Sequence, residues 1–201
     1  MRIQLVLASI VATLPLGAQT PAAPAAIPPA AEQIAAAILP LPNDLRAGAK
    51  VFGYKAGTKL ELLRDGKNGM TCLALYVHRR DFHVACYHDG LEPFMARGRE
   101  LREQGTLGDQ VDTVRFAEIK SGKLKMPPHG TLYSLTGPKT GWDAATGKVT
   151  GARPLTVMYM PFATPESTGL SAAPTASGSP WLMLPGTAKA HVMMVGSMGN
   201  Q

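Results

Sequence analysis

The sequence is short of the features that would assign a function directly. Its 201 residues include two cysteines, 6% aromatic and 17% charged residues, with 45% hydrophobic residues overall. This balance differs from that of a disordered polyelectrolyte and from that of a multispan membrane protein. After residue 18, no apolar run approaches the ~20 residues that a membrane-spanning helix needs. We therefore expect one domain with a modest core and no transmembrane segment in the mature chain.

Familiar catalytic motifs are also missing. No GxSxG sequence occurs, so the usual nucleophile turn of serine esterases has no support. The triplet Lys139-Thr140-Gly141 matches one signature of penicillin-recognising serine enzymes, but no SxxK motif accompanies it. The segment 141–148 has five residues between its glycines, where a phosphate-binding loop has four. The sequence therefore favours a non-catalytic protein, although an enzyme without a recognisable motif stays an alternative.

The first eighteen residues have the pattern of a secretory signal peptide. A basic start at Arg2 is followed by an apolar run of about fourteen residues and by the small residue Ala18. Residues 19–30 are rich in alanine and proline, which is typical of a linker, so the globular domain is expected over residues 31–201. The first cysteine, Cys72, lies far from the expected cleavage region, which argues against a lipid anchor. We expect a bacterial protein that is exported to the periplasm or the medium.

The charge balance is basic but does not by itself identify a partner. Twenty lysines and arginines against fourteen acidic residues give a formal net charge of +6. The basic residues are scattered in small clusters, as on an ordinary solvated surface. Because an exported protein meets little nucleic acid, we expect no nucleic-acid partner and instead an envelope ligand or an envelope protein.

Hydrophobic periodicity predicts an α+β domain. Short apolar runs between residues 50 and 88, separated by glycine and asparagine, predict a meander of antiparallel strands. Strand-like runs return at residues 131–137, 154–160, 181–184 and 190–195. Helical spacing predicts two inserted helices, over residues 90–105 and 110–121, and a short helix that ends at Pro40. The first inserted helix is expected to begin with a capping box of Asp89 and Glu92.

The two cysteines are predicted to form a structural disulfide. An even number of cysteines in an exported protein favours pairing, and Cys72 and Cys86 become directly opposite if paired positions sum to 158. That register places Ala74 opposite Val84 and Tyr76 opposite Phe82, with all of these residues on one face suited to burial. The absence of a CxxC spacing argues against a redox role.

Histidine and methionine provide the metal candidates. His78, His83 and His88 would be spread along one hairpin, too far apart to share an ion. His191 and Met193 would instead lie on one face of the last strand, where imidazole and thioether suit copper or haem iron. Methionine is also an ordinary core residue, so packing is the alternative explanation.

The segment 163–180 is predicted to be a long loop with a possible role in ligand binding. Glu166 and Ser167 within it would line a polar pocket, with Trp181 as a stacking wall. A mobile loop without a ligand is the equal alternative.

Five strings in the chain carry a resemblance to a group of proteins. They are NGMTCLA (68–74), FHVACYH (82–88), LEPFMARGRELR (91–102), LYSLTG (132–137) and PWLMLPGTAKAH (180–191). Together they resemble segments of uncharacterised secreted bacterial proteins. The resemblance implies export and a single domain, and it implies no activity, cofactor or site residue.

These observations predict an exported, non-catalytic domain that binds a ligand or a partner and is stabilised by Cys72 and Cys86. The alternatives are a copper- or haem-binding protein using His191 and Met193, and an envelope-directed hydrolase without a recognisable motif.

Overall fold

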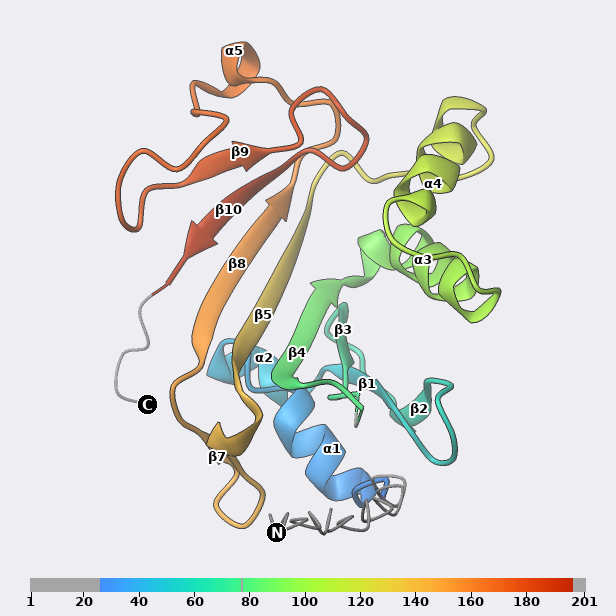
Figure 1. Ribbon diagram of the computed structural model, residues 1–201, viewed down its shortest axis with the longest axis vertical. Coiled ribbons are helices and arrows are strands. Elements are labelled where there is room, and N and C mark those ends of the chain that lie inside the picture. Colours follow the sequence, from blue (N-terminus) through green and yellow to red (C-terminus); the bar gives the residue numbers. More distant parts are fainter. Residues whose placement is uncertain (1–25, 77, 197–201) are drawn as a thin grey trace, which may run out of the picture.

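A computed structural model describes residues 26–76 and 78–196 of the chain. The predicted signal peptide and residues 19–25 of the predicted linker lie outside the described residues. Figure 1 shows a long twisted sheet with helices around it. Within the described residues, none of the helices has the length and apolar character needed to cross a bilayer.

The core of the fold is an eight-stranded sheet with the order β2-β1-β3-β4-β5-β8-β10-β9. All neighbouring strands are antiparallel except β1 and β3, which are parallel. The strands are β1 (Lys50–Gly53), β2 (Glu61–Arg64), β3 (Met70–Leu73), β4 (Asp81–His88), β5 (Gly130–Pro138), β8 (Arg153–Tyr159), β9 (Trp181–Met183) and β10 (His191–Val195). The predicted α+β class with a mostly antiparallel sheet is confirmed.

The predicted meander is wrong at one connection. β2 and β3 follow each other in the chain, yet β1 lies between them in the sheet. Burial explains this order, because Val51 of β1 is fully buried whereas Leu62 of β2 is 43% exposed and suits an edge strand. The returning segment passes against the start of β1 at Gly66, where a Cβ atom would lie only 2.2 Å from the Lys50 backbone nitrogen.

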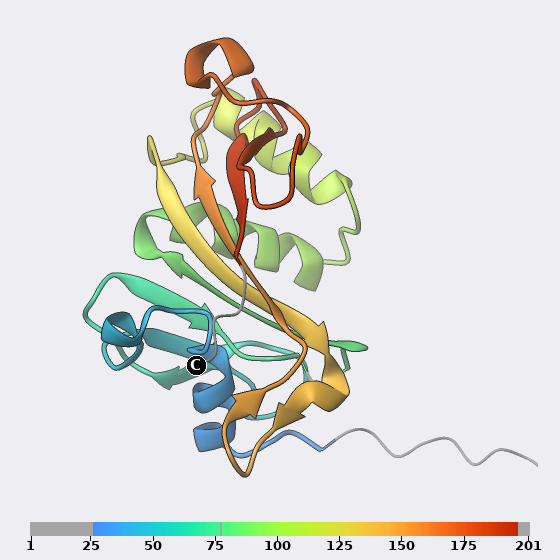
Figure 2. The same ribbon diagram turned by 90° about the vertical axis from the view of Figure 1, so that its left-hand side faces the viewer.

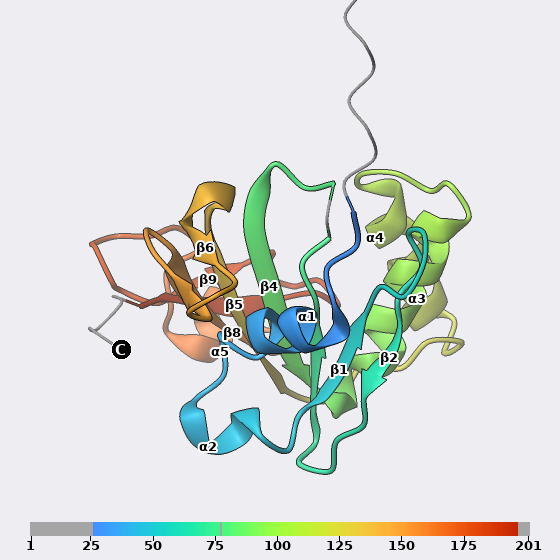
Figure 3. The same ribbon diagram turned by 90° about the horizontal axis from the view of Figure 1, so that it is seen from below.

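Helices cover both faces of the sheet. α1 (Ala30–Ala37) packs on the face that carries Cys72, Val84 and Cys86, with α2 (Asn43–Arg46) beside it (Figure 3). α3 (Glu92–Glu103) and α4 (Gln110–Lys120) pack on the opposite face, which carries Tyr87 and Val157 (Figure 2). Adjacent residues of a strand point to opposite faces, so Cys86 and Tyr87 lie in two separate core layers. The three predicted helices are therefore all present.

The start of α3 differs from the prediction. A 3₁₀ turn, η1 (Asp89–Leu91), precedes the helix, and its cap is His88, whose Nδ1 accepts the Gly90 N–H at 3.1 Å. Asp89 does not cap the helix. Its carboxylate accepts the Thr71 hydroxyl at 2.5 Å and lies 3.8 Å from Lys50 Nζ, which ties η1 to the sheet.

The disulfide prediction is confirmed. Cys72 and Cys86 are Cα partners across β3 and β4, their sulfur atoms are 2.05 Å apart, and both residues are fully buried. The predicted pairing stops earlier than expected, because β3 ends at Leu73. The N–H of Ala74 donates to the Phe52 carbonyl of β1 at 2.9 Å, which extends the contact with β1 past Leu73.

Shorter elements complete the fold at the two ends of the sheet. η2 (Lys139–Gly141) leads into a hairpin of β6 (Trp142–Asp143) and β7 (Lys148–Val149). The predicted loop at residues 163–180 contains a helical turn, α5 (Pro165–Thr168), with Gly169 as its left-handed C-cap. A small core beneath this loop contains Leu182 and Val192, which explains why the segment folds back on the sheet.

Candidate functional site

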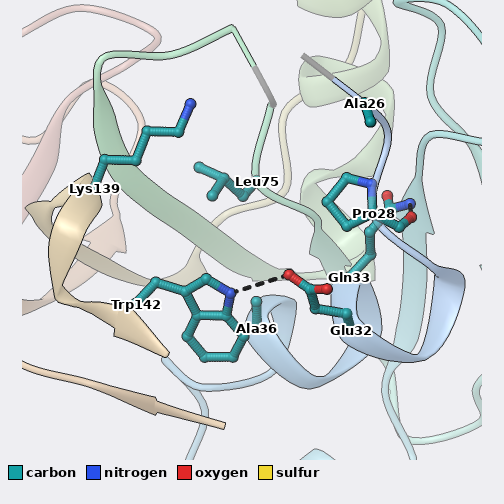
Figure 4. A pocket seen from close by; sticks show the side chains of 8 residues that line it. All are labelled: Ala26, Pro28, Glu32, Gln33, Ala36, Leu75, Lys139 and Trp142. Carbon is teal, nitrogen blue, oxygen red and sulfur yellow. Dashed lines mark hydrogen bonds between the residues drawn. The ribbon is translucent and has the colours of Figure 1, made fainter. Parts of the chain in front are cut away.

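A pocket of about 230 Å³ lies at the end of the sheet where the hairpin of β6 and β7 meets α1 (Figure 4). We call it the Trp142 pocket. It is lined by Ala26, Pro28, Glu32, Gln33, Ala36, Leu75, Lys139 and Trp142. These residues come from α1 and the segment before it, from the segment after β3, and from η2 and β6. Most of the lining is apolar, and the two charged side chains are Glu32 and Lys139.

Trp142 is fixed from two sides. Its ring stacks on Phe82 of β4, with centroids 5.6 Å apart and an interplanar angle of 26°. Its Nε1 donates to Glu32 Oε1 at 3.4 Å, a long hydrogen bond that crosses from β6 to α1. The hairpin itself is closed by Asp143, whose carboxylate accepts the Ala145 N–H and the Thr146 hydroxyl. The indole is therefore a preformed wall of the pocket.

Gln33 holds the other side of the pocket in place. Its side chain is buried, donates from Nε2 to the carbonyls of Pro28 at 2.7 Å and Tyr54 at 2.8 Å, and accepts the Tyr54 N–H at 2.8 Å. These three bonds connect α1, the segment before it and the end of β1. Because the amide is fully engaged, its role is to position the pocket wall rather than to contact a ligand.

The charged groups that line the pocket are the Glu32 carboxylate and the Lys139 ammonium group. Glu32 is half-buried, and the Trp142 bond occupies only one of the several acceptor positions of a carboxylate. Lys139 extends from η2 on the same side of the pocket as Trp142 (Figure 4), and it donates to the Arg79 carbonyl at 3.1 Å. A carboxylate beside an indole ring is an arrangement suited to a cation with an apolar body.

The eight lining residues include no serine, cysteine or histidine. The hydroxyl, thiol and imidazole groups of the commonest nucleophile–base pairs are therefore not among them. The triplet Lys139-Thr140-Gly141 forms η2, a turn that leads into β6.

The predicted metal ligands lie elsewhere, on β10. His191 and Met193 are two residues apart on one strand and so share a face, as predicted. His191 is buried, its Nδ1 lies 2.7 Å from the Lys189 carbonyl oxygen, and its ring centroid is 5.3 Å from that of Tyr159. Burial lowers the pKa of His191, so its imidazole is neutral at pH 7. Met193 packs against the core beneath α3, and a copper site here stays a prediction.

The three histidines of the predicted hairpin occupy separate places. His83 Nδ1 lies 2.8 Å from Thr136 Oγ1 on β5, His88 caps η1, and the ring of His78 lies 5.2 Å from that of Tyr76. Within residues 26–76 and 78–196, no group of three or more histidine, cysteine or acidic side chains is placed to hold a metal ion.

The predicted loop site is only partly organised. Ser167 and Thr164 form the capping box of α5, so the Ser167 hydroxyl is used within the turn. Glu166 is exposed, and its pKa is lowered by the Thr164 hydroxyl. Trp181 lies on β9 as the Cα partner of Met193. In the described part of the chain, no hydrogen bond or ring contact joins Trp181 to Glu166 or Ser167, and ligand binding by these three residues stays a prediction.

Sequence reasoning did not single out Trp142 or Glu32. The string GWDAATGK was interpreted as a turn, which the hairpin confirms, but a turn gives no reason to expect a ligand at its first aromatic residue. The two residues are 110 positions apart in the chain. The only sequence feature that could have indicated this site is the tryptophan at the start of the predicted turn segment.

Comparison of the chain with protein-family models, with curated proteins and with solved structures finds no match. The resemblance to uncharacterised secreted bacterial proteins therefore stays a prediction, and function has to be argued from the geometry.

Proposed function

We propose that the protein is an exported binding protein whose Trp142 pocket holds a small ligand with an apolar body and a cationic group. The observation that carries this proposal is the hydrogen-bonded pair of Trp142 and Glu32 at the edge of an apolar pocket. The apolar lining would bury the body of the ligand, and the carboxylate with the indole would recognise its positive charge.

The size and polarity of the pocket limit the ligand. At about 230 Å³ it is smaller than the roughly 300–1,000 Å³ of sites for drug-sized molecules. A small amine, or the cationic end group of a larger envelope molecule, therefore suits it best. A cation over an aromatic face contributes about 0.5–2 kcal/mol, depending on how far it is desolvated.

Export is a further part of the proposal. It is supported by residues 1–18, which have the pattern of a signal peptide, and by the buried disulfide of Cys72 and Cys86. These two residues are the only cysteines in the sequence. Disulfides persist mainly in oxidising compartments. Cleavage of the signal near Ala18 would release the protein into the cell envelope without a signal-peptide anchor.

The test of the pocket compares a cationic probe with a neutral probe of similar shape. We expect benzylamine to bind more tightly than benzyl alcohol, as measured by NMR titration of the Trp142 indole N–H. The Glu32→Gln substitution should weaken benzylamine binding about tenfold, since a hydrogen bond to a charged group contributes ~1.5–3 kcal/mol. It should leave benzyl alcohol binding nearly unchanged.

Two matched variants control this measurement. Glu103→Gln removes an exposed carboxylate from the end of α3, and Trp181→Leu removes the second tryptophan of the chain. Neither should change benzylamine binding, whereas Trp142→Leu, followed through the NMR signals of benzylamine because the indole is absent, should abolish it. Equal affinity of the wild-type protein for both probes, or unchanged benzylamine binding in Glu32→Gln, would contradict the proposed function.

Copper binding is the second candidate. His191 and Met193 share a face of β10, and Met183 of β9 is the Cα partner of His191, so two thioethers and one imidazole gather on that face. The Lys189 carbonyl next to Nδ1 leaves Nε2 as the ligand atom, which is a common arrangement around metal-binding histidines. Full copper content in a His191→Ala variant would rule this candidate out.

A further inference from the structure

We propose that the end of the molecule around Phe162 docks onto an anionic lipid bilayer. The docking surface, called the Phe162 surface, consists of Ile119, Lys120, Lys125, Pro127, Phe162 and Leu184. Its segments meet at the top of Figure 1, where the C-terminal end of α4 lies beside the turn after β8 and the connection from β9 to β10. This proposal concerns a different part of the molecule from the Trp142 pocket and does not depend on it.

Two apolar side chains stand out from this surface. Phe162 is 59% exposed and Leu184 is 41% exposed. Phe162 and Ile119 both border two open hollows, of about 490 and 520 Å³. The exposed aromatic ring therefore borders two mostly apolar hollows. Contiguous exposed apolar surface of this kind is typical of contacts with proteins or membranes.

The backbone holds both side chains outward against its own preference. Phe162 has φ of 65° and Leu184 has φ of 53°, and these are the two non-glycine residues with positive φ in the described part of the chain. Bulky residues rarely adopt this conformation, and such strain concentrates at functional sites.

Hydrogen bonds between the two turns maintain the strained conformation. The Phe162 N–H donates to the Thr187 carbonyl at 2.8 Å, and the Gly186 N–H donates to the Ala163 carbonyl at 2.8 Å. The Thr187 hydroxyl donates to the Leu184 carbonyl at 2.8 Å. The two projecting residues therefore belong to one rigid unit, and neither is the tip of a loose loop.

The charges around this surface favour an anionic occupant. Lys120 and Lys125 are exposed, border the two hollows, and form no ion pair within residues 26–76 and 78–196. The nearby carboxylate of Glu118 is already paired with Arg97 at 2.7 Å and with Lys123 at 3.4 Å. Projecting apolar groups flanked by lysines match the interface of an anionic bilayer, where acyl chains lie beneath acidic headgroups.

A bilayer fits this surface better than a folded protein partner does. Phe162 borders two open hollows, Leu184 is exposed on the turn hydrogen-bonded to it, and a fluid bilayer can surround both side chains without a complementary shape. Insertion of Phe162 and Leu184 to the depth of the headgroups would bring Lys120 and Lys125 to the acidic layer.

The test is cosedimentation of the processed protein with vesicles. The vesicles contain either phosphatidylcholine alone or phosphatidylcholine with phosphatidylglycerol. We expect binding to the anionic vesicles that weakens as salt is added. Phe162→Asn should reduce this binding about tenfold because it removes the inserted ring. Lys120→Gln and Lys125→Gln should each reduce it about fivefold.

The choice of asparagine separates docking from folding. Asparagine tolerates the left-handed conformation, so Phe162→Asn and Leu184→Asn should keep or raise the melting temperature while they weaken vesicle binding. Leu107→Asn, at a leucine that is 76% exposed before α4, is the matched control and should leave vesicle binding unchanged. Lys148→Gln, on β7 near the other end of the molecule, is the control for the lysines.

Three results would overturn the proposal. They are equal binding to neutral and anionic vesicles, unchanged binding in both asparagine variants, and no binding to either kind of vesicle. The last result would assign the Phe162 surface to a protein partner.

Discussion

At the scale of single residues, the two most buried histidines link protonation to stability. Burial lowers the pKa of His83, and the positive charge of Arg79 lowers it further, against a smaller opposing effect of Asp81. Burial also lowers the pKa of His191, although its hydrogen bond to the Lys189 carbonyl acts in the opposite direction. In the unfolded chain both imidazoles would titrate near their ordinary value of 6.5.

The sign of the pH dependence follows from these shifts. As the pH falls below about 6.5, the unfolded state takes up protons before the folded state does, so the free energy of unfolding decreases. The contribution of both histidines is therefore fully present above pH 6.5 and is lost as the pH falls towards their folded-state pKa values. We expect the urea midpoint to decrease between about pH 7 and pH 5.

The measurement compares this decrease in the wild type and in a double variant, His83→Gln with His191→Gln. The double variant should show a shallower decrease, whereas His129→Gln, at an exposed position, should behave as the wild type does. An identical pH profile in the double variant and the wild type would show that other groups cause the loss of stability between about pH 7 and pH 5.

At the scale of elements, the order of β2, β1 and β3 depends on a close backbone crossing. The segment after β2 returns past the start of β1, and the amides of Lys67 and Asn68 both donate to the Gly48 carbonyl. Arg64 strengthens the same junction by donating to the carbonyls of Arg46 and Ala49. The periodicity of each strand was visible in the sequence, but the crossing that decides their order was not.

Gly66 is the residue that allows this crossing. A Cβ atom there would lie 2.2–2.5 Å from backbone atoms of Gly48, Ala49 and Lys50, which cannot move without displacing β1. We expect Gly66→Ala to lower the free energy of unfolding by about 3 kcal/mol, measured by urea denaturation. Gly57→Ala is the control, since nothing lies within 4 Å of that position and only its positive φ of 63° is unfavourable. Its expected cost is about 1 kcal/mol, and equal costs at the two positions would contradict the role of the crossing.

At the scale of the whole molecule, the candidate sites lie in separate regions of one sheet. The Trp142 pocket lies against α1 near the ends of β4 and β5, and the Phe162 surface lies beyond the other end of β5 and β8. A molecule that docks at the Phe162 surface would therefore keep the Trp142 pocket open to its surroundings. This arrangement is compatible with a protein that stays at an envelope surface while it binds a small ligand.

Native mass spectrometry of the exported product tests the proposals at this scale. We expect a mass that corresponds to cleavage near Ala18 and that is lower by two hydrogens because of the disulfide between Cys72 and Cys86. Bound copper would favour the site at His191 and Met193, and a bound organic cation would favour the Trp142 pocket. An uncleaved chain recovered inside the cell would contradict the proposed export.

Features that depend on neighbouring residues could be predicted from the sequence alone. Hydrophobic periodicity located α3, α4 and most strands, and the alternation of side chains in a hairpin paired Cys72 with Cys86. The sequence pattern assigned the capping role to Asp89 incorrectly, because the Asp89 carboxylate accepts a hydrogen bond from Thr71 of β3 instead. Local patterns are informative because strand and helix geometry repeat over only a few residues.

The contacts between distant segments depend on tertiary packing and could not be predicted from local patterns. Burial placed β1 between β2 and β3, and it brought Glu32 to Trp142 across 110 positions of the chain. It also gathered α4, the turn after β8 and the connection from β9 to β10 around Phe162. Many pairings of the same strands satisfy the same periodicity, and the choice among them depends on how all apolar faces are buried at once, which no local pattern records.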